Sequence, residues 1–256
     1  MQRFEIAERK IYEAISASDG VKARTIAAVT GIERKTVNHY LYASPLMAEL
    51  CYQDKEYRWH SLISQQVPHY GLQEFSGFYS TVKEFLALNE EEWLSGLKQG
   101  CYNIGRNLND TRGLIHSFRD CRETMLALFS DLKLFVPEKA FAEWEICFEF
   151  RIKKSRHIRI YADVLLITGN RVFSLEFKMK DEILKEEIEQ AAKYVPFLEI
   201  IFGSGYEVIP VLVLTAGTDL FRFEPLQEDR GEVAVSSGDM LFNVLDYYMG
   251  FLPDNA

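Results

Sequence analysis

Residues 172–181 of the chain read VFSLEFKMKD, and this stretch decides how the second half of the sequence folds. Its apolar side chains are Val172, Phe173, Leu175 and Phe177. They predict a buried β-strand, yet Glu176 and Lys178 stand two residues apart and therefore share one face of it. A surface ion pair is the ordinary explanation and contributes at most about 1 kcal/mol. The flanking segments favour a functional site instead.

The two segments before this stretch also predict strands. They read WEICFEFRI over 144–152 and IRIYADVLLIT over 158–168. A basic turn over 153–156 joins them, and Gly169-Asn170, a dipeptide typical of hairpin turns, leads into the third strand. Asp163 interrupts an apolar strand, where an uncompensated carboxylate costs roughly several kcal/mol to desolvate. Because the hairpin pairs the second and third strands, we expect Asp163 beside Glu176.

Two carboxylates with a neighbouring lysine suit a divalent-cation site. Carboxylate oxygens hold Mg²⁺ or Mn²⁺, which keep several water ligands and bind phosphate oxygens. Such a cation lowers the pKa of a bound water and offsets phosphate charge, while an ammonium group stabilises the transition state. Phosphodiester hydrolysis needs this set. The alternatives are a structural ion pair with Asp163 capping a turn, or an inactive fold kept as a DNA-binding platform.

Helices and another strand are predicted around these strands. Apolar residues recur at helical spacing over about 112–132 and 179–201, and EVIPVLVLTA over 207–216 predicts a buried strand. Gln190 and Tyr194 stand four residues apart on the second helix and share one face. The predicted order is helix, three strands, helix, strand.

This order resembles the core of the PD-(D/E)XK nuclease superfamily. Asp163, followed by Glu176-Phe177-Lys178, is similar to the catalytic motif of that superfamily, with Ala162 where a proline is usual. Gln190 and Tyr194 resemble the glutamine and tyrosine motif of the RecB-like branch, which contacts DNA near the active site. The resemblance implies a restriction-endonuclease-like domain with a mixed central sheet flanked by helices.

The resemblance also implies roles for single residues. Asp163, Glu176 and the backbone carbonyl of Phe177 hold Mg²⁺ or Mn²⁺, and Lys178 assists the attacking water. The implied catalytic set is Asp163, Glu176, Lys178, Gln190 and Tyr194, the last two positioning the DNA strand. Family members often add an acidic ligand from the preceding helix. Glu123 is the expected residue, with Glu143 and Glu145 as competitors.

The first sixty residues predict a helix-turn-helix followed by a hairpin. Gly31 lies in the turn between two short helices. Their inner faces are Val21, Ile26 and Val29, then Ile32, Val37 and Leu41. The outward face of the second helix carries the polar and aromatic groups of a DNA recognition helix, namely Arg34, Lys35, Asn38, His39 and Tyr42. The segment ELCYQDKEYRWHSL then alternates apolar and polar residues, as a hairpin does.

These elements predict a winged helix that contacts DNA or, alternatively, another protein. The segment resembles the Zα family of winged helices, which bind left-handed duplex. By motif position the resemblance implies DNA contacts from Lys35, Asn38, Tyr42 and Trp59. The proline pair that precedes the tryptophan in that family is here replaced within Glu56-Tyr57-Arg58.

The predicted layout has three parts. Residues 1–64 form the winged helix, 65–110 a linker and helical connector, and 111–256 the nuclease-like domain. No run of about 18 apolar residues predicts a membrane span, and the N-terminus does not resemble a secretory signal, so we expect a cytoplasmic protein. The formal net charge of −9 argues against coating nucleic acid by bulk charge. The 4 cysteines form no Cys-x-x-Cys pair, so reduced thiols are expected.

The sequence therefore predicts a metal-dependent deoxyribonuclease with DNA as its partner, in DNA repair or anti-phage defence. A transcriptional regulator that reads an operator is one alternative. A subunit of a larger assembly, active only with a helicase or other repair or defence partner, is another. A homodimer is compatible with the sequence.

Overall fold

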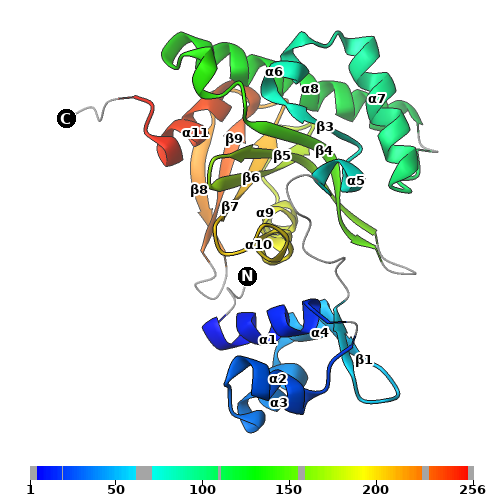
Figure 1. Ribbon diagram of the computed structural model, residues 1–256. Helices are drawn as coiled ribbons and strands as arrows, with labels where there is room; N and C mark the ends of the chain where they lie inside the picture. The colour runs from blue at the N-terminus through cyan, green and yellow to red at the C-terminus, as the bar shows by residue number, and fades with distance from the viewer. Residues whose placement is uncertain are drawn as a thin grey trace.

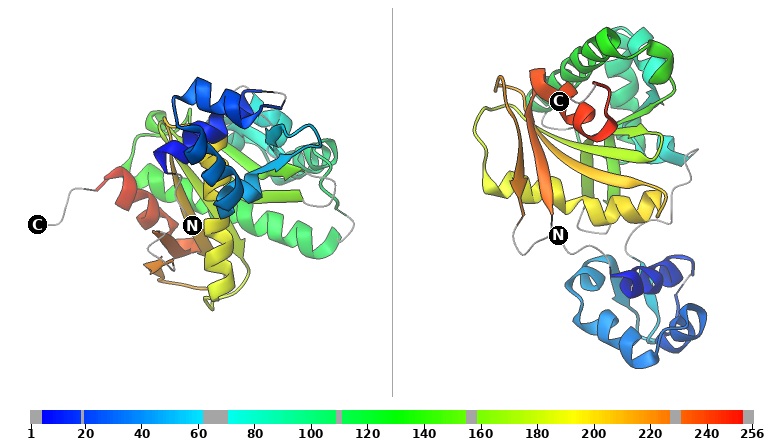
Figure 2. Two further views of the ribbon diagram at one scale, coloured as in Figure 1. Left: turned by 90° about the horizontal axis from the view of Figure 1, so that it is seen from below. Right: turned by 90° about the vertical axis from the view of Figure 1, so that its left-hand side faces the viewer.

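The computed structural model describes residues 5–18, 20–61, 71–108, 111–154, 159–226 and 231–252. They form a mixed α/β structure in which one sheet carries helices on both faces (Figure 1). A smaller N-terminal unit lies beside the helices of one face (Figure 2). The expectation of a mixed central sheet flanked by helices is confirmed. None of the described helices is both long enough and apolar enough to cross a membrane.

The N-terminal unit combines short helices with a hairpin. Its elements are α1 (Ile6–Ser16), α2 (Ala23–Thr30), α3 (Arg34–Ala43), α4 (Pro45–Leu50), β1 (Cys51–Gln53) and β2 (Trp59–Ser61). Gly31 ends α2 in the left-handed conformation with a φ of 69°, which glycine adopts without strain, and so turns the chain toward α3. β1 and β2 pair antiparallel, as predicted, and Val21 forms a bridge to Trp59.

One predicted core position in this unit is wrong. Val29 was expected on the inner face of α2, but its exposed fraction is 74%. The buried stripe of α2 runs through Ala23, Ile26 and Ala27, which follow the i, i+3, i+4 spacing of one helix face. Val29 lies outside that stripe.

The central sheet joins strands from most of the remaining chain. Within the described residues it has 7 strands in the order β3-β4-β5-β6-β7-β9-β8. The strands are β3 (Phe78–Thr81), β4 (Glu145–Lys154), β5 (Arg159–Thr168), β6 (Arg171–Lys178), β7 (Glu207–Leu214), β8 (Phe221–Pro225) and β9 (Glu232–Ser237). β7 runs parallel to both β6 and β9, and the other neighbours are antiparallel. The predicted hairpin from β5 to β6 is present, and Gly169 in its turn has a φ of 51°.

Helices cover the two faces of the sheet and bury separate apolar clusters. One face carries α6 (Val82–Ala87), α7 (Glu90–Asn103), α8 (Thr111–Phe135) and α11 (Leu241–Met249). The other carries α9 (Lys185–Lys193) and α10 (Val195–Phe202). Short helical turns are α5 (Leu72–Phe75), η2 (Glu138–Ala140) and η4 (Gly238–Met240). The predicted helix over 112–132 corresponds to α8.

Two predicted boundaries differ from the structure. The expected single helix over 179–201 is divided into α9 and α10 around Tyr194, because Pro196 lies in the first turn of α10 and fits a helix start better than an interior. The segment 65–110 is not simply a connector, since β3 pairs with β4 and forms an edge of the sheet. The first residues of the predicted linker, up to residue 70, and residues 155–156 of the predicted basic turn lie outside the described residues.

Candidate functional site

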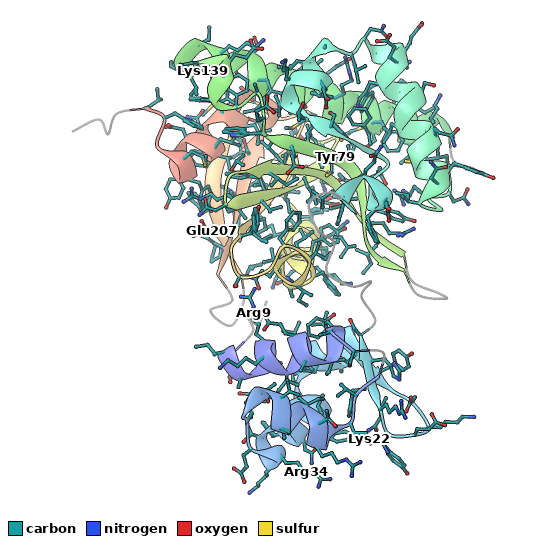
Figure 3. All side chains as sticks on the ribbon, viewed as in Figure 1. Arg9, Lys22, Arg34, Tyr79, Lys139 and Glu207 are labelled. Carbon is teal, nitrogen blue, oxygen red and sulfur yellow. The ribbon has the colours of Figure 1, made fainter. Side chains whose placement is uncertain are left out.

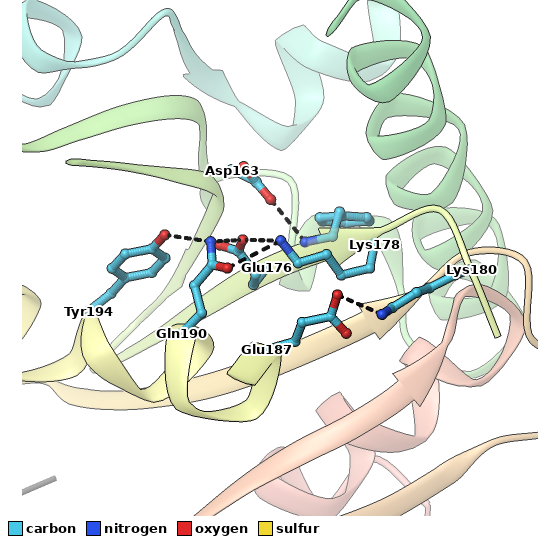
Figure 4. Close-up of polar contacts among 8 residues, drawn as sticks. Asp163, Glu176, Lys178, Lys180, Glu187, Gln190 and Tyr194 are labelled. Atoms are coloured by element: carbon cyan, nitrogen blue, oxygen red, sulfur yellow. Dashed lines mark hydrogen bonds and ion pairs between the residues drawn. The ribbon is translucent and has the colours of Figure 1, made fainter. Parts of the chain in front are cut away.

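The two predicted acidic ligands lie at one level of adjacent strands. The pair Val164 and Leu175 begins the ladder between β5 and β6, and the same register sets Asp163 opposite Glu176. There the ladder gives way to a side-chain bond, because the backbone N–H of Phe177 donates to Asp163 Oδ2 over 2.9 Å (Figure 4). The carboxylate of Asp163 therefore accepts the N–H that a backbone carbonyl of β5 would otherwise accept. Asp163 lies directly across from Glu176 on the neighbouring strand.

Glu176 is the centre of a polar network in an otherwise apolar strand. Its exposed fraction is 3%, and its Oε1 accepts hydrogen bonds from Lys178 Nζ at 2.9 Å and Gln190 Nε2 at 2.6 Å. Burial and the nearby Asp163 raise the pKa of Glu176 to about 8, although Lys178 acts in the opposite direction. Burial lowers the pKa of Lys178, but Glu176 and Asp163 outweigh it, so the pKa of this lysine is raised and it keeps its charge.

Helix α9 brings the predicted glutamine and tyrosine to the same place. Gln190 Nε2 also lies 3.2 Å from Tyr194 Oη, and Gln190 Oε1 accepts from Lys178 Nζ at 3.4 Å. Beside this group, Lys180 pairs with Glu187 at 2.7 Å (Figure 4). The five residues predicted as catalytic thus occur in one compact region of the molecule.

A cavity of about 540 Å³ opens over these groups. Asp163 and Glu176 line it from the sheet, and Gln190, Tyr194 and Lys193 line it from α9 and the residue that follows. Asp163 is partly exposed, and its desolvation by the fold raises its pKa, while the hydrogen bond from Phe177 and the charge of Lys178 oppose that rise. Both acids therefore border the same cavity, and Asp163 is the more exposed of the two.

The donor set of the cavity fits a hard divalent cation. Glu176 Oε2 is buried and has no hydrogen-bond partner among the described residues, so one carboxylate oxygen is left unsatisfied. No group of three or more His, Cys, Asp and Glu placed to hold a metal occurs in the described part of the chain. Mg²⁺ is commonly held by one or two carboxylates, with waters and substrate phosphates completing its shell, so two acids suffice.

The expected ligand from the preceding helix does not join the pair. Glu123 is exposed on α8 and does not line the cavity. Its competitor Glu145 accepts a hydrogen bond from Tyr79 in the edge strands, and Glu143 does not line the cavity either. The periodicity of α8 is set by its packing against the sheet, and the side of the helix that carries Glu123 faces away from that packing.

A third buried carboxylate escaped the sequence prediction. Glu149 on β4 has an exposed fraction of 3% and a φ of 52°, which is uncommon for a residue other than glycine. The strand pairs on either side of it, Phe148 with Val164 and Phe150 with Ala162, set Glu149 level with Asp163. The signal was visible in the sequence, since a lone acid between two phenylalanines raises the same question as Asp163.

Arg106 compensates this third acid. Its Nε lies 2.6 Å from Glu149 Oε2, an ion pair between a side chain that is 30% exposed and one that is 4% exposed. Burial and Asp163 raise the pKa of Glu149 to about 7, and Arg106 opposes that rise. Arg106 also lines the cavity. Helical or strand periodicity could not have identified Arg106, because this residue lies in the turn that follows α7.

Five of the six predicted DNA-contacting residues lie on α3 of the N-terminal unit, and none of the six lines the cavity. Arg34, Lys35, His39 and Tyr42 of α3 are exposed and Asn38 is partly exposed. Figure 3 shows Arg34 at the end of the unit that points away from the sheet. Trp59 is instead buried, with 6% exposed, and meets Tyr42 edge-on at 5.2 Å between ring centroids. It therefore packs against Tyr42 and is not an exposed contact residue.

No protein-family model matches the chain. No curated protein matches it significantly. Among solved structures, the chain is similar to protein VC1899 from Vibrio cholerae, with 11% sequence identity and a TM-score of 0.29. The similarity covers 98% of this chain and 58% of that one, so the chain spans little more than half the length of VC1899. A TM-score this low carries no argument about fold or function.

Proposed function

We propose that the chain is a metal-dependent nuclease that hydrolyses phosphodiester bonds in DNA. One observation carries the proposal: Asp163 and Glu176, from paired strands, line the same cavity while Lys178 bonds to Glu176. Burying two acids at one level of a sheet is unfavourable in itself, as the raised pKa values of both show. A divalent cation offsets this cost. Its positive charge also stabilises the negative charge on a phosphodiester during hydrolysis.

Each residue of the site has a distinct role in this proposal. Asp163 and Glu176 hold the Mg²⁺ or Mn²⁺ ion, with the backbone carbonyl of Phe177 as a further ligand. When bound, the ion stabilises negative charge on the phosphate and makes water a better nucleophile. Lys178 keeps its proton and stabilises charge that develops at the phosphate. Gln190 fixes the Glu176 carboxylate, and Tyr194 fixes Gln190.

The strand order supports a PD-(D/E)XK assignment within this proposal. The hairpin β5–β6 carries the acids, α9 crosses over one face, and β7 returns parallel to β6. This is the succession expected for a RecB-like core, with the glutamine of α9 next to the acidic pair.

The N-terminal unit acts as a Zα-like winged helix that recruits DNA. Its support is the exposed cationic and polar face of α3 beside the β1–β2 hairpin, with Tyr42 braced by Trp59. A second, weak DNA contact on the same chain raises the effective concentration of DNA at the cavity. With an overall charge of −9, attraction of DNA depends on local cationic groups such as those of α3 and not on bulk charge.

The test is cleavage of linear, circular and single-stranded DNA with and without Mn²⁺. Glu176→Ala is expected to reduce Mn²⁺-dependent cleavage at least about 100-fold, because removing a metal-holding carboxylate should cost more than the roughly 10–100-fold lost with a partner that only orients one. DNA binding should be nearly unchanged, since α3 lies elsewhere. Glu232→Ala, which alters an exposed acid of the same sheet, is the matched control and should cleave normally. Cleavage by Glu176→Ala at the parent rate would show that the site is wrongly assigned.

A further inference from the structure

Arg106 reaches the wall of the cavity from a turn that fixes its backbone. Gly105 has a φ of 72°, and the N–H of Arg106 donates to the carbonyl of Cys101 over 2.8 Å. This closes the end of α7 and directs the side chain toward β4 and β5. The guanidinium carbon then lies 4.6 Å from the ring centroid of Tyr161, so the ring limits the orientations that the group can take.

The other partly buried arginines of this region show what a structural arginine does here. Arg122 donates through Nη2 to the carbonyl of Leu88 at 2.8 Å, and Arg151 donates through Nη1 to the carbonyl of Ile104 at 2.8 Å. Each uses a terminal amino group to donate a hydrogen bond to a backbone carbonyl. Arg106 makes no such bond within the described residues, and its contacts are the ion pair to Glu149 and the ring of Tyr161.

The side chains that line the cavity include more acids than cations, so few of them can offset the charge of a phosphate. The acids that line it are Asp163, Glu176, Glu186 and Glu189, against Arg106 and Lys193 as cations. A nucleic-acid strand entering this space brings one further negative charge per phosphate, and two carboxylates are already committed to the cation. Guanidinium groups bind phosphate through paired N–H donors, which gives them an orientation that an ammonium lacks.

We infer that Arg106 binds a backbone phosphate of the DNA strand in the cavity, next to the phosphate that is cleaved, while Glu149 and Tyr161 hold its guanidinium plane in place. This inference rests on the proposed nuclease function and adds a positioning residue to it. Glu149 pairs with Nε, and the terminal amino groups provide the two donors for the phosphate.

The test is a scan of single methylphosphonate substitutions along a fluorescent single-stranded oligonucleotide, with affinity measured by anisotropy and cleavage measured in Mn²⁺. Each substitution replaces one charged phosphate with a neutral group. For the parent protein, we expect one position next to the cleavage site at which binding weakens roughly tenfold. Arg106→Gln should bind the unmodified strand with that same loss and should no longer respond at that position, while other positions still respond.

Two further variants separate this role from a purely structural one. Arg106→Gln combined with Glu149→Gln leaves no buried unpaired charge and should show the same insensitive position. Arg119→Gln breaks a comparable arginine–glutamate pair at the surface, where Arg119 Nε lies 2.6 Å from Glu90, and should respond like the parent.

The outcomes distinguish this inference from the proposed function. A parent protein that shows no Mn²⁺-dependent cleavage overturns the proposed function. If the parent cleaves but both Arg106 variants keep the sensitivity of the parent at every position, only the role of Arg106 is overturned.

Discussion

Gln190 joins the charged groups of the site through one amide. Its Nε2 donates to Glu176 at 2.6 Å, and its Oε1 accepts from Lys178 at 3.4 Å. Because an amide carries both donors and an acceptor, it can satisfy a carboxylate and an ammonium at once. Neither aspartate nor lysine can do both. Gln190 and Lys178 therefore both bond to Oε1 of Glu176, which leaves its Oε2 without a hydrogen-bond partner among the described residues.

Removing this amide should weaken metal binding without unfolding the protein. We expect Gln190→Ala to lower Mn²⁺ affinity by about 10–100-fold, the usual effect of losing a partner that orients a ligand. Isothermal titration with Mn²⁺ alone measures this directly. Glu182→Ala, which changes an exposed residue ahead of α9, is the control and should bind Mn²⁺ as the parent does. Equal affinities for all three proteins would exclude an orienting role for Gln190.

Single residues differ in how far the sequence reveals their role. Asp163 and Glu176 were identified because charges inside apolar strands are costly, and the hairpin between them is a local feature. Glu149 carries the same signal, but its partner Arg106 is 43 positions away in the numbering of the chain and no local pattern links them. Trp59 was expected as a contact and is buried, because exposure of a wing residue depends on how the hairpin packs against α3.

The packing of α7 against β3 depends on two glycines. A Cβ added at Gly100 would lie 1.9 Å from the carbonyl oxygen of Gly77, which is backbone and cannot rotate away. Gly77 in turn donates its N–H to the carbonyl of Glu149 at 3.2 Å. The close approach of this helix therefore supports the strand segment that carries the third buried acid.

A methyl group at position 100 should be costly, whereas one turn earlier it should be favourable. We expect Gly100→Ala to lower the free energy of unfolding by about 1–3 kcal/mol or more, through overpacking. Gly96→Ala on the same helix meets only the ring of Phe78 at 3.7 Å, so its better helix propensity should raise stability by roughly 0.5–1 kcal/mol. Urea unfolding measures both. Equal effects of the two variants would contradict the close contact.

Elements were predictable where their pattern was local and long. The strands β4, β5 and β6 and the helix α8 follow from alternation and helical periodicity over eight residues or more. The edge strand β3, of 4 residues, was missed because so short a segment carries little pattern and is defined by its pairing with β4. β8 was missed for a related reason, since its pairing with β9 is its main constraint.

At the scale of the whole molecule, the buried acids of the site make the free energy of unfolding depend on pH. The pKa of Glu176 is about 8 in the folded chain, against an ordinary value of 4.5, and the pKa of Asp163 is also raised. Between those values the folded chain keeps a proton that the unfolded chain releases. The stabilising contribution of Glu176 is therefore complete below pH of about 4.5 and is lost as the pH rises through about 8.

A divalent cation should reverse this trend, because it binds the deprotonated carboxylates and displaces the proton. We expect Mn²⁺ to raise the Tm more at pH 8 than at pH 6, since at pH 6 it must compete with protons on Glu176 and Asp163.

Without Mn²⁺, the free energy of unfolding of the parent should fall between pH 5 and pH 8 relative to Glu176→Gln, by on the order of a few kcal/mol. Scanning calorimetry of both proteins at each pH, with Mn²⁺ and with a chelator, measures the two effects together. Because Glu176→Gln has no carboxyl group to titrate at this position, it should lose most of the pH-dependent gain from Mn²⁺. A gain that is the same at both pH values, or larger at pH 6, would mean that the buried acids are not where the cation binds.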